Sequence, residues 1–187
     1  MNRQELQEII LEEKGMYVPD NYRFQKFTHQ KRYMIWRYLS YFRKAQYWKG
    51  ELSNPNCGQV QKLIGRLAWR YYLRKKNIFG EKSGVEIANH CKLGRRIDIW
   101  HGNVIINANL GDDCIIHGNN VLGNKGDTKA NEIPTLGRHV DVGVGAVIIG
   151  SISITDDCRI GANAVVIRSC DVPGSTIVGV PAEVKGK

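Results

Sequence analysis

Residues 136–183 divide into eight consecutive six-residue units: LGRHVD, VGVGAV, IIGSIS, ITDDCR, IGANAV, VIRSCD, VPGSTI and VGVPAE. Each unit begins with an aliphatic residue and carries a small or compact residue four positions later. The aliphatic series is Leu136, Val142, Ile148, Ile154, Ile160, Val166, Val172 and Val178. A period of six fits neither an α-helix nor one straight strand. It predicts a parallel β-helix, in which each unit is one face of a coil, three units close a triangle, and the aliphatic side chains point inward.

The same repeat runs earlier in the chain, with two interruptions. Its aliphatic positions there are Ile87, Leu93, Ile99, Val104, Leu110, Ile116 and Leu122. The step from Ile99 to Val104 is five residues, so the repeat slips by one residue at 100–102. The fourteen-residue step from Leu122 to Leu136 contains the polar segment 124–131, which we expect to leave the coil as a loop. About five coils are predicted in all.

The chain before the repeat has a different composition. Residues 22–78 contain fourteen Lys and Arg against one acid, and residues 22–79 contain fourteen of the sixteen aromatic residues. Apolar residues at helical spacing predict three helices, over about 2–14, 22–48 and 58–77, with a break at Pro19–Asp20–Asn21. We therefore expect a helical, basic and aromatic region over 1–82 and a β-helix domain over 83–187.

The overall composition narrows the classes of protein. The 187 residues are 42% hydrophobic and 24% charged, with a net charge of +9 that points to an anionic partner. No apolar run of membrane-spanning length and no apolar signal core is present, which predicts a cytoplasmic protein. Three interpretations of the basic region stay open: helix packing with a solvated cationic face, contact with an anionic membrane surface or polymer, and nucleic-acid binding, which no recognised motif supports.

The cysteines support the coil and argue against a metal site. Cys91, Cys114, Cys158 and Cys170 all fall four residues after an aliphatic position. We expect them to be small buried apolar residues and not ligands, and we expect no metal.

The hexapeptide series, ending in the motif Val178-Gly179-Val180-Pro181-Ala182, resembles the left-handed β-helix acyltransferases over about residues 84–185. Within that group it is most similar to the serine acetyltransferase branch and its relatives in capsule and exopolysaccharide O-acetylation. The resemblance implies a mainly β fold with left-handed coils, acetyl-CoA as co-substrate, and a homotrimer with active sites between subunits. Pairing of two trimers through the N-terminal helices stays open.

Transfer of an acetyl group from a thioester to a hydroxyl requires a base, and histidine is the natural one near neutral pH. His101 is the predicted base because it lies at the slip in the repeat, follows Trp100, and matches the family's catalytic histidine when 85–101 is aligned without a gap. The same alignment places Glu86 at the family's orienting carboxylate, fifteen residues upstream. A surface histidine beside a solvated Glu86 is the alternative. His117 is the second candidate base and, with Trp100, a predicted acceptor-binding residue.

The resemblance also implies residues for the co-substrate. The segments that border the pantetheine arm match Gly143, Gly145, Ala146, Gly161 and Ala162. Pro181 and Ala182 match the region near the adenine, and Lys185 is placed to meet phosphate. The amide of Gly145 is a candidate donor to the oxyanion. Ordinary turn chemistry is the alternative explanation of these glycines.

Two departures from serine acetyltransferases bear on the acceptor. This chain has Trp100 where those enzymes have an aspartate, and Glu132-Ile133-Pro134 where they have an Arg-His pair before a proline. The departures favour a sugar hydroxyl of a capsular or extracellular polysaccharide or its precursor, because an indole stacks well on a sugar face. The alternatives are serine O-acetylation in cysteine biosynthesis and a non-catalytic scaffold that binds anionic polymer or membrane. Transfer to oxygen or to nitrogen stays open.

Overall fold

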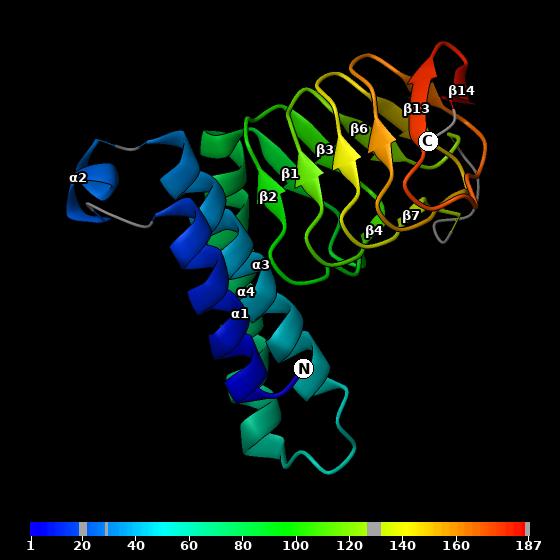
Figure 1. Cartoon of the computed structure of the whole chain (residues 1–187). Helices are drawn as coiled ribbons and strands as arrows, with labels where there is room; N and C mark the ends of the chain where they lie inside the picture. The colour runs from blue at the N-terminus through cyan, green and yellow to red at the C-terminus, as the bar shows by residue number, and fades with distance from the viewer. Residues whose placement is uncertain (19–21, 29, 127–131, 186–187) are drawn as a thin grey trace. The chain divides into compact units, whose positions relative to one another are not determined.

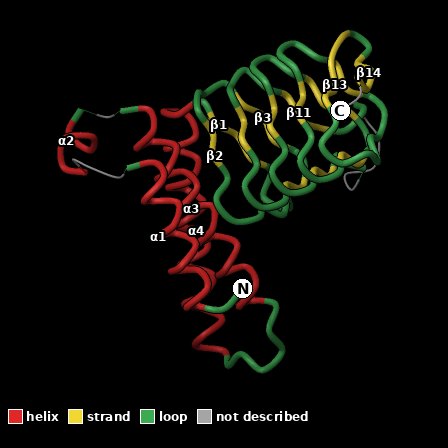
Figure 2. Tube along the Cα trace, viewed as in Figure 1, coloured by secondary structure: helices red, strands yellow, loops and turns green. Residues whose placement is uncertain are grey.

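The computed structural model describes residues 1–18, 22–28, 30–126 and 132–185. The predicted break at 19–21, His29 and most of the predicted loop, 127–131, therefore lie outside the described residues. The chain divides into two compact units, Met1–Ser83 and Gly84–Lys187. The first is helical and the second is built from short strands (Figure 2).

The helical unit contains α1 (Arg3–Tyr17), α2 (Tyr22–Phe27), α3 (Lys31–Leu52) and α4 (Gln59–Ser83) in its described part. α3 packs along both α1 and α4. The prediction of one helix over 22–48 is wrong, because Gln30 has a ψ of 142° and interrupts the helical backbone between α2 and α3. The apolar period continues across this point, so the sequence pattern does not show the break. No described helix is long and apolar enough to span a membrane.

Five aromatic residues of α3 contribute to the core of the helical unit. They are Tyr33, Trp36, Tyr38, Tyr41 and Phe42, and all five are buried. The Arg37 guanidinium lies over the ring of Tyr41, 4.7 Å from its centroid. For these five aromatic residues, helix packing is confirmed. A cationic residue of this region, Arg43, is also buried, where it forms an ion pair with Glu13 of α1.

The strands of the second unit form three sheets, one on each face of a triangular coil (Figure 1). The first face holds β1 (Val85–Ile87), β3 (Val104–Ile106), β6 (Val121–Gly123), β9 (Val147–Ile149) and β12 (Val165–Val166). The second holds β4 (Asn109–Leu110), β7 (Thr135–Leu136) and β10 (Ser153–Ile154). The third holds β2 (Asp98–Ile99), β5 (Ile115–Ile116), β8 (Asp141–Val142), β11 (Arg159–Ile160), β13 (Thr176–Gly179) and β14 (Ala182–Lys185). Only β14 pairs antiparallel among these described strands, and the five strands of the first face correspond to five coils.

The predicted inward positions are buried from Leu136 to Val166, which confirms the repeat through the fourth coil. The four cysteines at the fourth-after positions are also buried, as predicted. The prediction for Val172 is wrong, because its exposed fraction is 55%. Ile154 pairs with Cys170, sixteen residues later, so the last coil is shorter by two residues. Cys170 and Ile177 consequently take the inward positions.

The two interruptions of the repeat change the length of single coils. Val147 pairs with Val165 eighteen residues later, whereas Val121 pairs with Val147 after twenty-six. The insert thus adds eight residues to one coil without breaking the ladder. Around the slip at 100–102, Val85 pairs with Val104 after nineteen residues. Ladder pairing tolerates such changes because the extra residues lie in the corners between faces.

Candidate functional site

Two rings and two glycines follow one another along the third face of the coil. The amide of Trp100 donates to Ile116, that of His117 to Val142, and that of Gly143 to Ile160, so successive coils are in register here. Gly161 continues the column by donating to Ile177. Because Ile99, Ile116 and Val142 point inward, the residues that follow them point outward. The column therefore presents an indole and an imidazole beside two positions, Gly143 and Gly161, that carry no side chain.

The His117 ring is held by two contacts. Its Nε2 lies 2.8 Å from Oδ1 of Asp141, and its ring centroid lies 4.5 Å from that of Trp100. The indole Nε1–H in turn donates to Oδ2 of Asp98 at 3.0 Å. Trp100 has an exposed fraction of 43%, and His117 and Asp141 are partly exposed. The four residues form a continuous polar and aromatic array that solvent and ligands can reach.

His101 lies on an exposed bend directly after Trp100. A Cβ added to Gly118 would lie 2.7 Å from the Cβ of His101, so these two residues stack on neighbouring coils at one corner. His101 and His117 therefore flank the same corner. The predicted histidine candidates are brought together, and with them the predicted acceptor residue Trp100.

The predicted partner of His101, Glu86, lies on the face that follows this corner, where Gly84 packs against Gly102 and Asn103. Glu86 occupies the outward position of β1 on the first face, in register with Ile105. Within the described part of the chain, no hydrogen bond or ion pair joins Glu86 to His101. The carboxylate that meets an imidazole at this corner is instead Asp141, on His117. Sequence reasoning missed Asp141 because the eight-residue insert lengthens this coil to twenty-six residues. With that length Asp141 is in register with Ile115, two residues before His117.

The residues predicted to border the pantetheine arm gather at the same corner. A Cβ on Gly143 would lie 2.7 Å from the amide nitrogen of Ala162, which places the two predicted segments on adjacent coils. The Gly145 amide donates to the carbonyl of Gly118 at 2.9 Å, so this conformation does not leave it for an oxyanion. Its predicted role as oxyanion donor is therefore not supported.

Asn120 ties these segments to the coil of His117. Its side chain is fully buried, accepts from the amide of Gly118 at 2.8 Å, and donates to the carbonyl of Gly143 at 2.7 Å. It also donates to Ala146 at 3.3 Å. The position of the Gly143–Ala146 turn is thereby fixed relative to His117. The sequence pattern gave no sign of this buried amide.

The remaining predicted co-substrate residues lie at the C-terminal hairpin. Pro181 lies in the turn between β13 and β14, Ala182 begins β14, and Lys185 ends it. Lys185 is largely exposed, with Nζ 3.8 Å from a carboxylate oxygen of Glu183. β13 pairs with β11, the strand that precedes Gly161, so the hairpin continues the same face.

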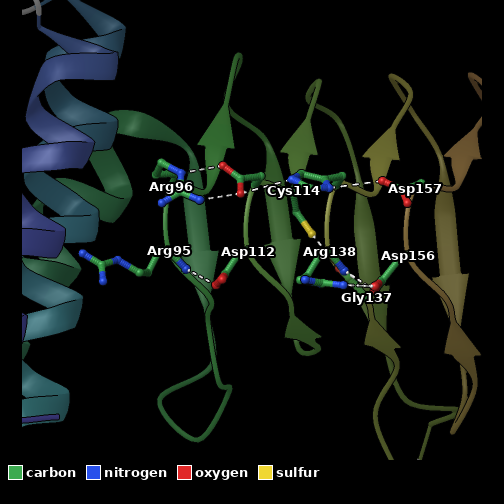
Figure 3. A network of polar contacts seen from close by, with 10 residues as sticks. Arg95, Arg96, Asp112, Cys114, Gly137, Arg138, Asp156 and Asp157 are labelled. Atoms are coloured by element: carbon green, nitrogen blue, oxygen red, sulfur yellow. Dashed lines mark hydrogen bonds and ion pairs between the residues drawn. The ribbon is translucent and has the colours of Figure 1, made fainter.

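A second polar array lies at a different corner and has a structural role (Figure 3). Arg96 donates two hydrogen bonds of 2.6 Å to Asp113, and His139 bridges Asp113 and Asp157 at 3.3 and 3.1 Å. These four residues have φ between 54° and 61° and turn successive coils. Hydrogen bonds from Arg96, more than any other contact, hold the pKa of Asp113 below its usual range. Burial raises the pKa of the nearby Cys114 thiol to about 11, which keeps it protonated and inert.

Among the described residues, no group of three or more His, Cys, Asp or Glu is arranged to hold a metal ion. His90, on an exposed turn, lies apart from both arrays.

The coils and their preceding helices place the fold in a defined class, the left-handed parallel β-helix of the serine acetyltransferase structures. The soybean serine acetyltransferase apoenzyme has a TM-score of 0.70 and 22% identity, over 97% of this chain and 69% of that one. The serine acetyltransferase of Neisseria gonorrhoeae has a TM-score of 0.70 and 24% identity, over 98% and 68%. At these identities the likeness establishes the fold.

Curated proteins that are similar in sequence are serine acetyltransferases, of which two are described here. That of Helicobacter pylori strain J99 is 44% identical over 105 residues, which is 54% of this chain and 60% of that protein. That of Mycobacterium tuberculosis is 38% identical over 108 residues, 56% of this chain and 47% of that protein. The chain thus spans about half of the length of these relatives. No family model matches the chain.

Proposed function

We propose that the chain is an acetyltransferase that moves the acetyl group of acetyl-CoA to a hydroxyl. The observation that carries this proposal is the 44% identity to a serine acetyltransferase over 105 residues. A structure of the Brucella abortus serine acetyltransferase in complex with coenzyme A, with a TM-score of 0.66 to this chain, supports the co-substrate. The names of these relatives support L-serine as the acceptor of this chain more than the polysaccharide acceptor predicted from the sequence.

The corner that carries His101 and His117 is the proposed site of the reaction. An imidazole there takes the proton of the acceptor hydroxyl as its oxygen attacks the thioester. The resemblance assigns this role to His101 and an orienting role to Glu86. The bare positions at Gly143 and Gly161 suit the close approach of a narrow pantetheine chain. A homotrimer, in which a second subunit covers this edge of the coil, is part of the proposal.

A sugar hydroxyl is the second candidate acceptor, and the array around Trp100 favours it. The half-exposed indole offers a face on which a pyranose ring can stack. Two carboxylates, Asp98 and Asp141, flank the rings and can accept hydrogen bonds from sugar hydroxyls. The same carboxylates would repel the carboxylate of a serine acceptor.

An acceptor panel tests the proposal. The full chain is incubated with acetyl-CoA and either L-serine or a set of neutral and acidic oligosaccharides, and release of the CoA thiol is followed. We expect thiol release that depends on the acceptor. It should fall by about 100-fold or more in His101→Ala, which removes the proposed base. His90→Ala is the matched control, since His90 lies outside the corner. Absence of both acetyl-CoA binding and thiol release would favour the non-catalytic scaffold.

A further inference from the structure

Two cationic side chains of α3 lie along the seam where α3 and α4 run side by side (Figure 1). The Arg37 guanidinium carbon lies 5.5 Å from the ring centroid of Phe79 on α4. Lys44 Nζ lies 5.7 Å from the ring centroid of Tyr72, also on α4. Both cationic residues are only partly buried, so a solute in the surrounding water can reach the seam.

The two cations converge on the ring of Tyr41. The Arg37 guanidinium lies 4.7 Å from the centroid of this ring, and Lys44 Nζ lies 5.8 Å from it. Spacings of four and three residues place all three side chains on one stripe of α3. The Tyr41 hydroxyl accepts a hydrogen bond from Nη2 of Arg37, so its own proton stays free to be donated to a further acceptor. A guanidinium, a phenol and an ammonium thus offer donors on consecutive turns.

The chain supplies no opposite charge to this stripe. Residues 22–80 contain one acid, Glu51, which is seven residues beyond Lys44 and therefore about 10 Å further along α3. The buried carboxylate of Glu13 is already engaged by Arg43. Within the described residues, neither Arg37 nor Lys44 forms an ion pair, and Nε of Arg37 is buried without an acceptor.

This arrangement leaves positive charge uncompensated in a partly apolar setting. Burial, and after it the charge of Arg37, holds the pKa of Lys44 below its usual range. Two neighbouring cations disfavour each other, and moving them out of water costs free energy when no counter-charge accompanies them. An anion at the stripe would relieve both effects.

A phosphate group suits the stripe better than a carboxylate does. A phosphate carries a charge of about −2 and three acceptor oxygens, which matches two cations and three kinds of donor. A carboxylate offers a single charge and two oxygens. Arginine is also the side chain whose planar fork of donors fits phosphate oxygens in pairs.

We propose that Arg37, Tyr41 and Lys44 form a binding site for a phosphate group on the helical unit. The group belongs either to a soluble phosphate compound or to a phospholipid headgroup, and the experiment below distinguishes these sources. All three residues lie in α3, outside the coil that carries the proposed acetyl transfer. The site therefore stands or falls independently of that activity.

Titration calorimetry of the full chain with sodium pyrophosphate tests the site, with the ionic strength held constant by sodium chloride. We expect Lys44→Met to weaken binding about tenfold, because it removes a charged hydrogen-bond donor and keeps an apolar side chain of similar length. Lys49→Met is the matched control: it lies on the same helix, is exposed, and loses the same charge. Its affinity should stay within about twofold of the wild type, since salt screens an exposed charge outside the site. Circular dichroism verifies that both variants fold.

Chemical labelling locates the bound phosphate and identifies its source. Lysines of the wild-type chain are modified with an amine-reactive ester, and mass spectrometry follows Lys44 and Lys49 separately. Pyrophosphate should slow the labelling of Lys44 several-fold and leave Lys49 unchanged. The same measurement is made with vesicles of phosphatidylglycerol and with vesicles of phosphatidylcholine alone. Selective protection of Lys44 by pyrophosphate alone identifies a soluble ligand, and selective protection by phosphatidylglycerol vesicles identifies a lipid headgroup.

The contrary results are equally distinct. Equal affinities of Lys44→Met and Lys49→Met for pyrophosphate, with Lys44 labelled at an unchanged rate, overturn the proposal. Pyrophosphate bound elsewhere, for example on the coil, gives this outcome. Equal slowing of Lys44 and Lys49 also overturns it, because that result reflects general attraction of anions to a chain of net charge +9.

Discussion

At the scale of the residue, the corner with two histidines depends on Gly118. Its φ of +123° is a conformation that L side chains rarely adopt, and the space where its Cβ would lie is taken by the Cβ of His101. Neighbouring coils are only about 4.8 Å apart, so a side chain at position 118 would occupy the space of the His101 side chain. Glycine at 118 thus leaves room for His101 on the adjacent coil.

We expect Gly118→Ala to destabilise the protein by about 1–3 kcal/mol, because a non-glycine residue is forced into a strained backbone and against His101. Urea unfolding at neutral pH measures the change. Gly126→Ala is the matched control, since Gly126 also has a positive φ, of +56°, but nothing lies within 4 Å of an added Cβ. If the two variants lose equal stability, contact with His101 contributes nothing and only backbone strain remains.

At the scale of the element, a buried ion pair joins α1 to α3. Arg43 Nη2 lies 2.7 Å from Oε1 of Glu13, and both side chains are almost fully buried, with Glu13 at 0% exposure. Burial raises the pKa of Glu13, although Arg43 opposes this. A carboxyl with a raised pKa in the folded state loses stabilisation as the pH rises above its ordinary range. The pair thus orients α1 on α3 at an electrostatic cost.

Removal of Glu13 alone should be strongly destabilising. We expect Glu13→Ala to cost about 3–5 kcal/mol, because the Arg43 guanidinium loses its buried counter-charge. The double variant Glu13→Leu with Arg43→Met should recover most of this loss, since apolar side chains of similar volume fill the same space. Chemical denaturation followed by circular dichroism measures both variants. Equal losses in the single and double variants would contradict the electrostatic explanation.

At the scale of the whole molecule, α4 presents an apolar stripe to solvent. Val60, Leu63, Ile64, Leu67 and Tyr71 have exposed fractions between 53% and 71%. Their spacing of three and four residues places them on one face of the helix. A contiguous stripe of this kind is typical of an interface, and a two-fold axis would let it pair with the same stripe of a second copy.

We expect the stripe to mediate self-association through α4. Leu63→Glu combined with Leu67→Glu should halve the assembly size measured by light scattering after gel filtration, because two charges are buried against their copies. Gln61→Glu, an exposed position on the same helix, is the matched control for added charge. An unchanged mass for the double variant would show that α4 does not pair in solution.

The extent of prediction differs between the wall of the coil and its corners. The inward series was correct from Leu136 to Val166 because every coil there keeps a regular length. It failed at Val172, where two residues are lost from the last coil and Cys170 takes the inward place. The corner was predicted in part. Trp100, His101 and His117 gather there, Glu86 lies on the face that follows, and the carboxylate in contact with an imidazole, Asp141 on His117, was not predicted.

The spacing of aliphatic residues determined by itself that this chain winds into a three-sided coil, because a period of six fits neither a helix nor a straight strand and is typical of a parallel β-helix. The concentration of basic and aromatic residues before residue 80 likewise distinguished a helical unit from the coil. Only the tertiary structure decided which side chains meet across coils. Inserts and slips in the corners shift the register by whole residues, so Asp141 reaches His117 across twenty-four positions of sequence. Contacts of that kind depend on the summed length of every intervening corner, which local residue patterns do not contain.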